Sequence, residues 1–223
     1  MIKAIIFDFD GTMTNRTANA YGVFDYYLKP FFKDFSEIEY EAMLQDMMLY
    51  DCNGTIPVRL RATPFINKYH DYLPDDFVEK FAEYYYTHMF EYTELKPETI
   101  NVLERLKSNY KIALLSNGNS KSQHDKIDQV GINKYFDEVM VSGDYDVHKP
   151  DPKIFEMMAD KLNVKCEECL MVGDVFSSDI LGASKAGMIP VWLLLDSERP
   201  AKHYDGFRIK KLDEIFSILD KLD

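Results

Sequence analysis

The sequence predicts a doubly wound α/β fold, with a parallel sheet core and an all-helical segment inserted near its amino-terminal end. Two patterns favour this fold. From residue 93 onward, short continuous apolar runs alternate with amphipathic helical stretches, as in sheets covered by helices on both faces. Residues 15–92 instead lack β-branched runs and carry aromatic residues at helical spacing. We therefore expect a core of residues 1–14 and 93–223 and an inserted helical domain of residues 15–92.

The inserted segment is expected to form several helices. Aromatic residues from Phe24 to Phe35 recur at a spacing that is typical of the buried face of a helix. Ser36 and Glu39 form a capping-box pattern, which predicts a helix through about Leu49. Further helix starts are predicted at Pro57, with a bend at Pro64, and at Pro74.

The remaining segments alternate between strand and helix, as in a series of βαβ units. Because the apolar runs are short and continuous, the strands are expected to be buried on both faces of the sheet. The expected strands cover residues 3–8, 111–115, 138–141, 169–172 and 190–195. The expected helices of the core cover residues 97–108, 120–130, 152–162, 178–186 and 212–222.

Composition and charge limit the classes of partner. A formal net charge of −12 argues against non-specific binding to nucleic acids or anionic membranes, which requires a surplus of Lys and Arg. No apolar stretch reaches the length of a membrane span, and the first apolar run meets Asp8 too soon for a signal peptide. The three cysteines predict a reducing compartment and hence a cytoplasmic protein. The oligomeric state is left open between a monomer and a homodimer.

Two aspartates, Asp8 and Asp10, stand at the end of the first predicted strand. Residues i and i+2 of a strand point to the same face, so both carboxylates can reach one cavity. Two carboxylates that close repel each other, which raises one pKa unless a cation intervenes. The pair therefore predicts a bound divalent metal or a carboxyl group that stays protonated and serves as an acid, and an enzyme can use both.

Other strand ends also carry polar or charged side chains. Ser116 and Asn117 follow one predicted strand and Asp174 follows another, while Lys149 precedes a predicted helix. Asp179 comes five residues after Asp174. In open parallel sheets, ligands bind at the carboxyl ends of the strands, near the point where the strand order reverses. We expect these side chains to share one site with the aspartate pair.

In chain order, these residues resemble the four motifs of the haloacid dehalogenase-like hydrolases, a superfamily made mostly of phosphatases. The run DFDGT after the first strand resembles the first motif, and GDVFSSDILGASKAGM from Gly173 to Met188 resembles the fourth motif with its helix. Ser116 and Lys149 match the second and third motifs. The resemblance covers the whole chain. Because members often carry a cap after the first motif, it implies a core with an inserted all-helical cap domain.

The resemblance also implies the chemistry of the site. Asp8 would be the nucleophile that forms an aspartyl-phosphate, which suits a carboxylate because it is ionised at neutral pH. Asp10 would protonate the leaving oxygen and then accept a proton from water. Mg²⁺ would be held by Asp8, the backbone carbonyl of Asp10 and Asp174. The partner would be a small phosphorylated metabolite.

Ser116, Asn117 and Lys149 would bind the substrate, and two of them would also take part in catalysis. Ser116 would donate a hydrogen bond to a phosphoryl oxygen, and Lys149 would neutralise the nucleophile and the transferring group. Asp179 is expected to orient Lys149 or a metal-bound water.

In the inserted segment, Arg59 and Arg61 are candidate substrate contacts, since a guanidinium group suits phosphate and carboxylate. On a helix they lie ~200° apart, so only one is expected to face a ligand. Surface charges explain the two arginines equally well. The run Gly54-Thr55-Ile56 before them resembles caps of nucleoside-monophosphate phosphatases of this superfamily.

The predicted function is Mg²⁺-dependent hydrolysis of a small phosphomonoester, such as a nucleoside monophosphate or a sugar phosphate. The alternative is a sugar phosphomutase, which shares all four motifs. A 2-haloacid dehalogenase would lack the second aspartate and the metal, so Asp10 and Asp174 argue against it. A non-catalytic binding module would be expected to show a broken motif, and none is broken.

Overall fold

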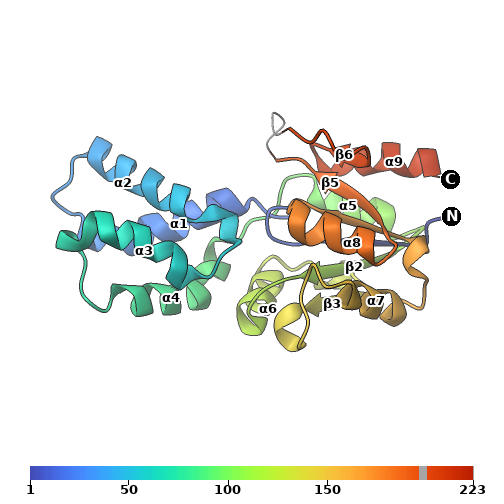
Figure 1. Cartoon of the computed structure of the whole chain (residues 1–223), viewed down its shortest axis with the longest axis horizontal. Helices are drawn as coiled ribbons and strands as arrows, with labels where there is room; N and C mark the ends of the chain where they lie inside the picture. The colour runs from blue at the N-terminus through green and yellow to red at the C-terminus, as the bar shows by residue number, and fades with distance from the viewer. Residues whose placement is uncertain (196–199, 223) are drawn as a thin grey trace. The chain divides into compact units, whose positions relative to one another are not determined.

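The computed structural model divides into two compact units, shown in Figure 1. The core unit comprises Met1–Asn15 and Leu95–Asp223, and the helical unit comprises Arg16–Glu94. The structure describes the whole chain except residues 196–199 and 223. The parts of the predicted core range that fall on those residues lie outside the described residues.

The core unit is built on a parallel sheet. Within the described residues, six strands pair in the order β3-β2-β1-β4-β5-β6, and every pairing is parallel. The strands are β1 Ala4–Phe7, β2 Lys111–Ser116, β3 Glu138–Val141, β4 Cys169–Gly173, β5 Ile189–Leu193 and β6 Phe207–Ile209. The predicted α/β class with a doubly wound parallel sheet is confirmed. The edge strand β6 was not predicted, because three residues give too short a pattern and pairing with β5 defines it.

Helices cover both faces of this sheet. They are α5 Thr99–Leu106, α6 Ser120–Gln129, α7 Pro152–Lys161, α8 Leu181–Lys185 and α9 Ile215–Leu222. Alternate residues of β1 point to opposite faces, so Ile5 and Phe7 pack in one apolar cluster and Ala4 and Ile6 in the other. Helices α5, α6 and α9 cover the face of Phe7, whereas α7 and α8 cover the face of Ile6.

The register of the central strands brings several polar residues to one edge. Phe7 pairs with Leu114 on one side and with Val172 on the other. The residues that follow these strands therefore emerge at the same level. Since β1 lies where the strand order reverses, this edge is the position at which open α/β sheets bind ligands.

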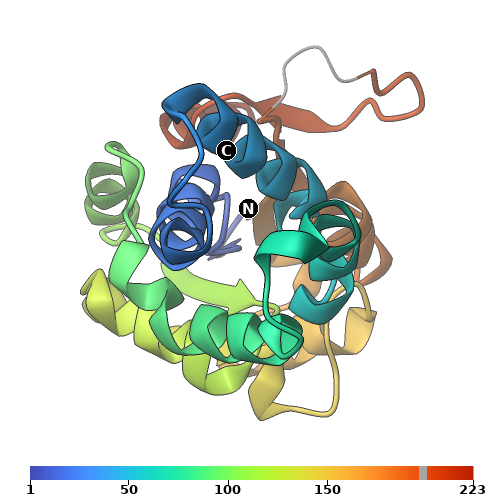
Figure 2. The same cartoon turned by 90° about the vertical axis from the view of Figure 1, so that its left-hand side faces the viewer.

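The helical unit is described throughout and holds four α-helices and no strand. Figure 2 shows these helices in blue to green. These helices are α1 Arg16–Leu28, α2 Glu37–Tyr50, α3 Val58–Tyr69 and α4 Phe77–His88. The predicted capping box is present, since the Ser36 backbone N–H donates to the Glu39 carboxylate at 2.9 Å. Of the predicted aromatic stripe, Phe24 and Phe32 are buried inside the unit, where Phe24 packs against Phe81. Among all described helices, none is long and apolar enough to cross a membrane.

Candidate active site

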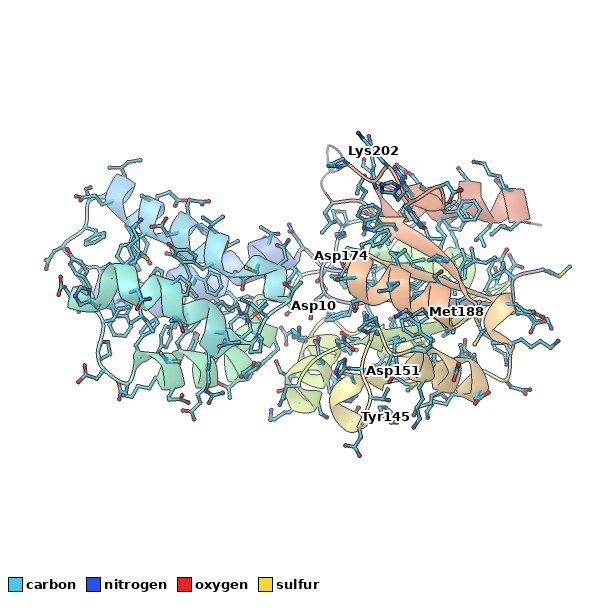
Figure 3. The ribbon with its side chains drawn as sticks, in the orientation of Figure 1. Asp10, Tyr145, Asp151, Asp174, Met188 and Lys202 are labelled. Carbon is cyan, nitrogen blue, oxygen red and sulfur yellow. The ribbon has the colours of Figure 1, made fainter. Side chains whose placement is uncertain are left out.

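The first and fourth motifs meet at the carboxyl edge of the sheet. Asp8 directly follows β1, and Asp174 directly follows the neighbouring strand β4. Figure 3 shows Asp10 and Asp174 at this end of the core, whereas Met188, directly before β5, lies towards the other end. The parallel direction of the strands thus collects the polar ends of separate segments in one place.

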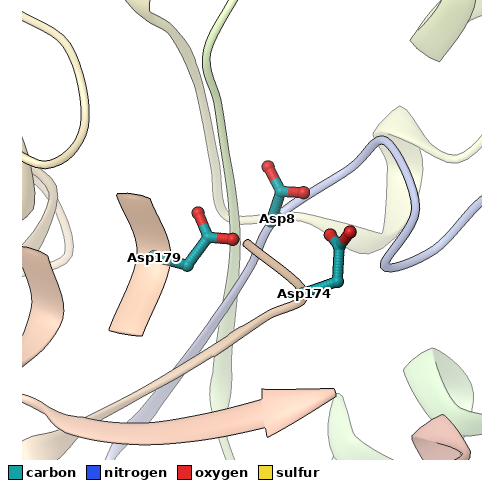
Figure 4. Close-up of side chains that lie close together, drawn as sticks. All are labelled: Asp8, Asp174 and Asp179. Atoms are coloured by element: carbon teal, nitrogen blue, oxygen red, sulfur yellow. The ribbon is translucent and has the colours of Figure 1, made fainter. Parts of the chain in front are cut away.

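Three carboxylates form a compact acidic cluster at this edge. Oxygens of Asp8, Asp174 and Asp179 all lie within 4.8 Å of one another. Figure 4 shows the three side chains beside one another, carried by separate segments of the chain. Asp8 and Asp179 are buried, and Asp174 is partly buried. Three negative charges in so small and dry a volume require compensation.

Lys149 provides part of this compensation. Its Nζ lies 2.6 Å from Asp8 Oδ1 and 2.7 Å from Asp179 Oδ1, and it donates to the Leu115 carbonyl at 2.9 Å. The side chain is 2% exposed, so its three donors are directed entirely to protein oxygens. Asp179 therefore lies in direct contact with Lys149, the residue that it was expected to orient.

The raised pKa values of the aspartates indicate that Lys149 balances only part of the negative charge of the cluster. Burial raises the pKa of Asp8 well above its usual value, Asp179 and Asp174 raise it further, and Lys149 only partly opposes them. Burial and Asp179 raise the pKa of Asp174 to about 6. Burial alone would lower the pKa of Lys149, but the charges of Asp179 and Asp8 prevail and raise it. Surplus negative charge on oxygen donors fits a hard divalent cation such as Mg²⁺.

Gly11 and Thr12 of the first motif shape this cluster. Gly11 has φ +84°, and a Cβ atom there would come within 2.6 Å of Asp174 Oδ2. A larger residue would therefore be strained and would displace the carboxylate. The Thr12 hydroxyl lies 3.0 Å from Asp174 Oδ1 and 3.4 Å from Asp8 Oδ2, so its single proton can serve one carboxylate at a time. Gly11 and Thr12 thus help to position Asp174 beside Asp8.

Ser116 and Asn117 occupy the adjacent strand end. Ser116 is buried, and its Oγ accepts a hydrogen bond from Gln123 Nε2 at 3.0 Å. The Asn117 side chain bonds to the Lys149 backbone in both directions, donating to its carbonyl at 2.8 Å and accepting from its N–H at 2.9 Å. The structure therefore places Asn117 as an anchor for the segment that carries Lys149.

Asp10 lies outside the acidic cluster and has its own partners on α6. Its Oδ2 accepts a hydrogen bond from Gln123 Nε2 at 2.8 Å and forms an ion pair with Lys126. Sequence reasoning missed both partners. The available signal was their spacing of three on a helix that begins right after the second motif, which places them on one face.

The two predicted arginines of the helical unit lie in different environments. Arg61 is buried and pairs with Asp51, which also binds Arg16. Arg59 is exposed and its guanidinium binds the Glu79 carboxylate at 2.6 Å. As expected from their spacing on α3, the two side chains point to different sides of the helix. Arg61 is held inside the unit.

Comparison with known proteins agrees with this geometry. The sequence matches the haloacid dehalogenase-like hydrolase family over residues 2–187. The chain belongs to that family.

A glyceraldehyde 3-phosphate phosphatase from Methanothermobacter thermautotrophicus is 35% identical over 130 residues, 56% of this chain and 58% of that protein. A pyrimidine 5′-nucleotidase from Escherichia coli is 32% identical over 127 residues, 56% of each chain. The chain thus spans a little over half the length of these curated relatives.

A solved haloacid dehalogenase-like hydrolase from Bacillus subtilis, described as bound to magnesium, has the same fold. It superposes with a TM-score of 0.78 at 21% identity, covering 98% of this chain and 99% of that chain. In the present haloacid dehalogenase-like hydrolase, the structure brings together residues of all four motifs within the core unit. Arg59 and Arg61 belong to the helical unit.

Proposed function

We propose that this hydrolase is a Mg²⁺-dependent phosphatase that cleaves a small phosphomonoester through an aspartyl-phosphate on Asp8. The observation that carries the proposal is the contact of Asp8 with Lys149, at 2.6 Å, inside an acidic cluster. A buried carboxylate beside a buried ammonium group is a nucleophile held in one orientation, and the nearby cation reduces its repulsion of an anionic substrate.

The reaction takes two steps. An Asp8 oxygen attacks phosphorus, the bond between phosphorus and the leaving oxygen breaks, and Asp10 gives its proton to that oxygen. A water molecule then attacks the phosphorus of the aspartyl-phosphate, Asp10 accepts the proton of the water, and inorganic phosphate leaves as Asp8 is regenerated.

The metal would be held by the carboxylates of Asp8 and Asp174 and by the backbone carbonyl of Asp10. When bound, magnesium supplies the positive charge that lets a carboxylate and a phosphate, both anions, approach each other. The raised pKa of Asp174 supports this assignment, because it reports negative charge that the protein leaves uncompensated.

Ser116 is proposed to hold the phosphoryl group by a hydrogen bond, and Lys149 to act on it through its positive charge. Lys149 neutralises charge on the nucleophile and on the transferring group, and Asp179 keeps its ammonium group in place. Ser116 Oγ accepts from Gln123, so its own proton is available for a phosphoryl oxygen. Asn117 would contribute by anchoring the Lys149 backbone.

The inserted segment, residues 15–92, is proposed to act as a cap that selects the substrate. The core motifs address only the phosphoryl group and the metal, so the rest of the substrate must be recognised elsewhere. The named relatives act on a triose phosphate and on pyrimidine nucleotides. We therefore place the substrate among small phosphorylated metabolites, with a sugar phosphate and a nucleoside monophosphate as the two classes to compare.

A phosphate-release screen tests this proposal. Triose phosphates, hexose phosphates and nucleoside monophosphates are incubated with the protein in Mg²⁺, and inorganic phosphate is measured. We expect release from at least one class, loss of activity in EDTA, and loss of activity in Asp8→Asn. Asp160→Asn, at an exposed position of α7, is the matched control and should remain active.

The outcomes of this screen are distinct. Full activity after exhaustive EDTA treatment would remove magnesium from the proposal. Conversion of a hexose 1-phosphate into its isomer, without free phosphate, would establish a phosphomutase in place of a phosphatase. Halide release from a 2-haloacid, with no phosphate released from any ester, would establish a dehalogenase.

A further inference from the structure

We propose that Lys126 and Gln123 are positioning residues that orient the Asp10 carboxylate for proton exchange with the leaving oxygen. The inference rests on the proposed phosphatase function and adds two residues to it. Neither residue belongs to the four motifs of the family, and both are assigned by their contacts with Asp10.

Lys126 is committed to Asp10. It lies on α6 with its side chain 7% exposed, and its ammonium group forms an ion pair with Asp10 Oδ2. The same Nζ lies 5.7 Å from the centre of the Phe9 ring, a cation–π contact. Among the described residues, Asp10 provides the carboxylate at Lys126. Removing a lysine from water is costly, so such a buried lysine is strongly tied to its carboxylate.

Gln123 links Asp10 to the second motif. Its Nε2 lies 2.8 Å from Asp10 Oδ2, 3.0 Å from Ser116 Oγ and 2.8 Å from the Asn117 carbonyl. An amide nitrogen carries two protons, so these three acceptors compete for them. The Gln123 side chain thus connects Asp10 and Ser116, which follow different strands of the sheet.

The local backbone places both residues. Asn119 caps α6, with its side chain accepting from the Ser122 N–H at 3.1 Å, which fixes where the helix begins. Gly118 has φ +154°, and a Cβ atom there would lie 2.7 Å from Gln123 Cγ. Gln123 thus fills the space that the missing side chain leaves beside the second motif.

A general acid must direct its proton along one line, and a short aspartate side chain can rotate about two bonds. Two donors on the same oxygen restrict that rotation. Without Lys126, the carboxylate would sample other orientations, and protonation of a poor leaving group would slow. A good leaving group needs no proton, so its departure would be affected little.

The test compares leaving groups in Lys126→Met. The value of kcat/KM reports the steps through phosphoryl transfer to Asp8. It is measured for the alkyl phosphate that releases most phosphate in the screen above and for p-nitrophenyl phosphate. We expect a loss on the order of 10-fold or more on the alkyl ester, within the range for general acid catalysis, and a loss below about threefold on the nitrophenyl ester. Lys121→Met, an exposed lysine of the same helix that pairs with Asp125, is the control and should change neither value.

A double-mutant cycle distinguishes a role of Lys126 that acts through Asp10 from a role that is independent of Asp10. If Lys126 acts through Asp10, Asp10→Asn with Lys126→Met should be no slower on the alkyl ester than Asp10→Asn alone. If the losses in kcat/KM of the two single variants multiply in the double variant, the proposal is overturned. Equal losses on both esters in Lys126→Met would also overturn it. Should the methionine variant fail to fold, Lys126→Gln should show the same difference between leaving groups.

A measurement independent of turnover distinguishes this proposal from the phosphatase assignment. Urea unfolding of the wild type, both single variants and the double variant should reveal a coupling free energy between Asp10 and Lys126. Coupling together with no phosphate release from any ester would refute the phosphatase and leave the contact standing. Phosphate release with no coupling and no leaving-group effect would refute the positioning role alone.

Discussion

At the scale of single residues, the charge state of the acidic cluster follows from burial. Asp174 loses water on folding and faces Asp179, so the pKa of its carboxyl group rises from 3.8 to about 6. A carboxyl group with a raised pKa is stabilised by a proton or, equally, by a metal ion. Asp174 is therefore a residue at which both pH and metal should affect the folded state.

This shift predicts a pH-dependent free energy of unfolding in EDTA. Below about pH 4 the carboxyl group is protonated in both folded and unfolded chains, and the contribution of Asp174 is fully present. Between about pH 4 and 6 the unfolded chain loses the proton first, so this contribution falls as pH rises, by on the order of 3 kcal/mol in total. We expect the wild type to show this fall relative to Asp174→Asn in urea unfolding from pH 4 to 7.

The metal supplies the complementary measurement. At pH 7, where Asp174 is ionised, excess Mg²⁺ should raise the unfolding temperature of the wild type more than that of Asp174→Asn, because only the folded state offers the site. If the free energies of unfolding of the two proteins change in parallel with pH, and Mg²⁺ raises both unfolding temperatures equally, Asp174 carries no surplus charge.

At the scale of elements, the ends of four helices in the helical unit are joined by one buried ion network. Asp51, directly after α2, binds Arg16 of α1 at 2.5 Å and 3.0 Å and also binds Arg61 of α3. Arg16 Nη2 lies 3.0 Å from the hydroxyl group of Tyr85 on α4. Two guanidinium groups therefore share the Asp51 carboxylate, and Asp51 is 1% exposed.

This arrangement predicts a large effect of Asp51→Asn on stability. The substitution removes the negative charge that both buried guanidinium groups contact, and breaking a buried pair in this way typically costs about 3–5 kcal/mol. Glu79→Gln, which breaks the exposed contact with Arg59, is the matched control and should change the urea midpoint little. A small effect of Asp51→Asn would mean that water reaches the network.

At the scale of the whole molecule, the structure decides which arginine can test substrate selection by the inserted segment. Arg61→Ala would disrupt the buried network with Asp51, so its kinetic effect would mix folding with binding. Arg59 is exposed, and its removal leaves that network intact.

We expect Arg59→Ala to raise KM for the native substrate with kcat unchanged, which is the signature of lost uniform binding. Turnover of p-nitrophenyl phosphate should stay the same, because that ester offers no second group for an arginine to hold. Lys80→Ala, an exposed cation of α4 paired with Asp76, is the control. If KM is unchanged on every substrate, specificity lies elsewhere in residues 15–92.

The sequence alone determined the fold class and where the motif residues stand along the sheet. The apolar runs of β1, β2 and β4 are local patterns, and in parallel strands the residues after each run must emerge at one edge. For that reason the order of strands and polar residues along the chain is sufficient to predict that Asp8 and Asp174 lie together. The capping box of α2 was equally readable, because both of its partners lie within one turn.

Only the tertiary structure decided which distant side chains meet. Asp10 and Lys126 are 116 residues apart, and no local periodicity relates them. The same holds for Asp51, whose two arginines come from different helices, and for Asn117, which binds the Lys149 backbone instead of an open surface. Periodicity reports which face of an element is buried, whereas partners across elements depend on how the packed layers bring those faces together.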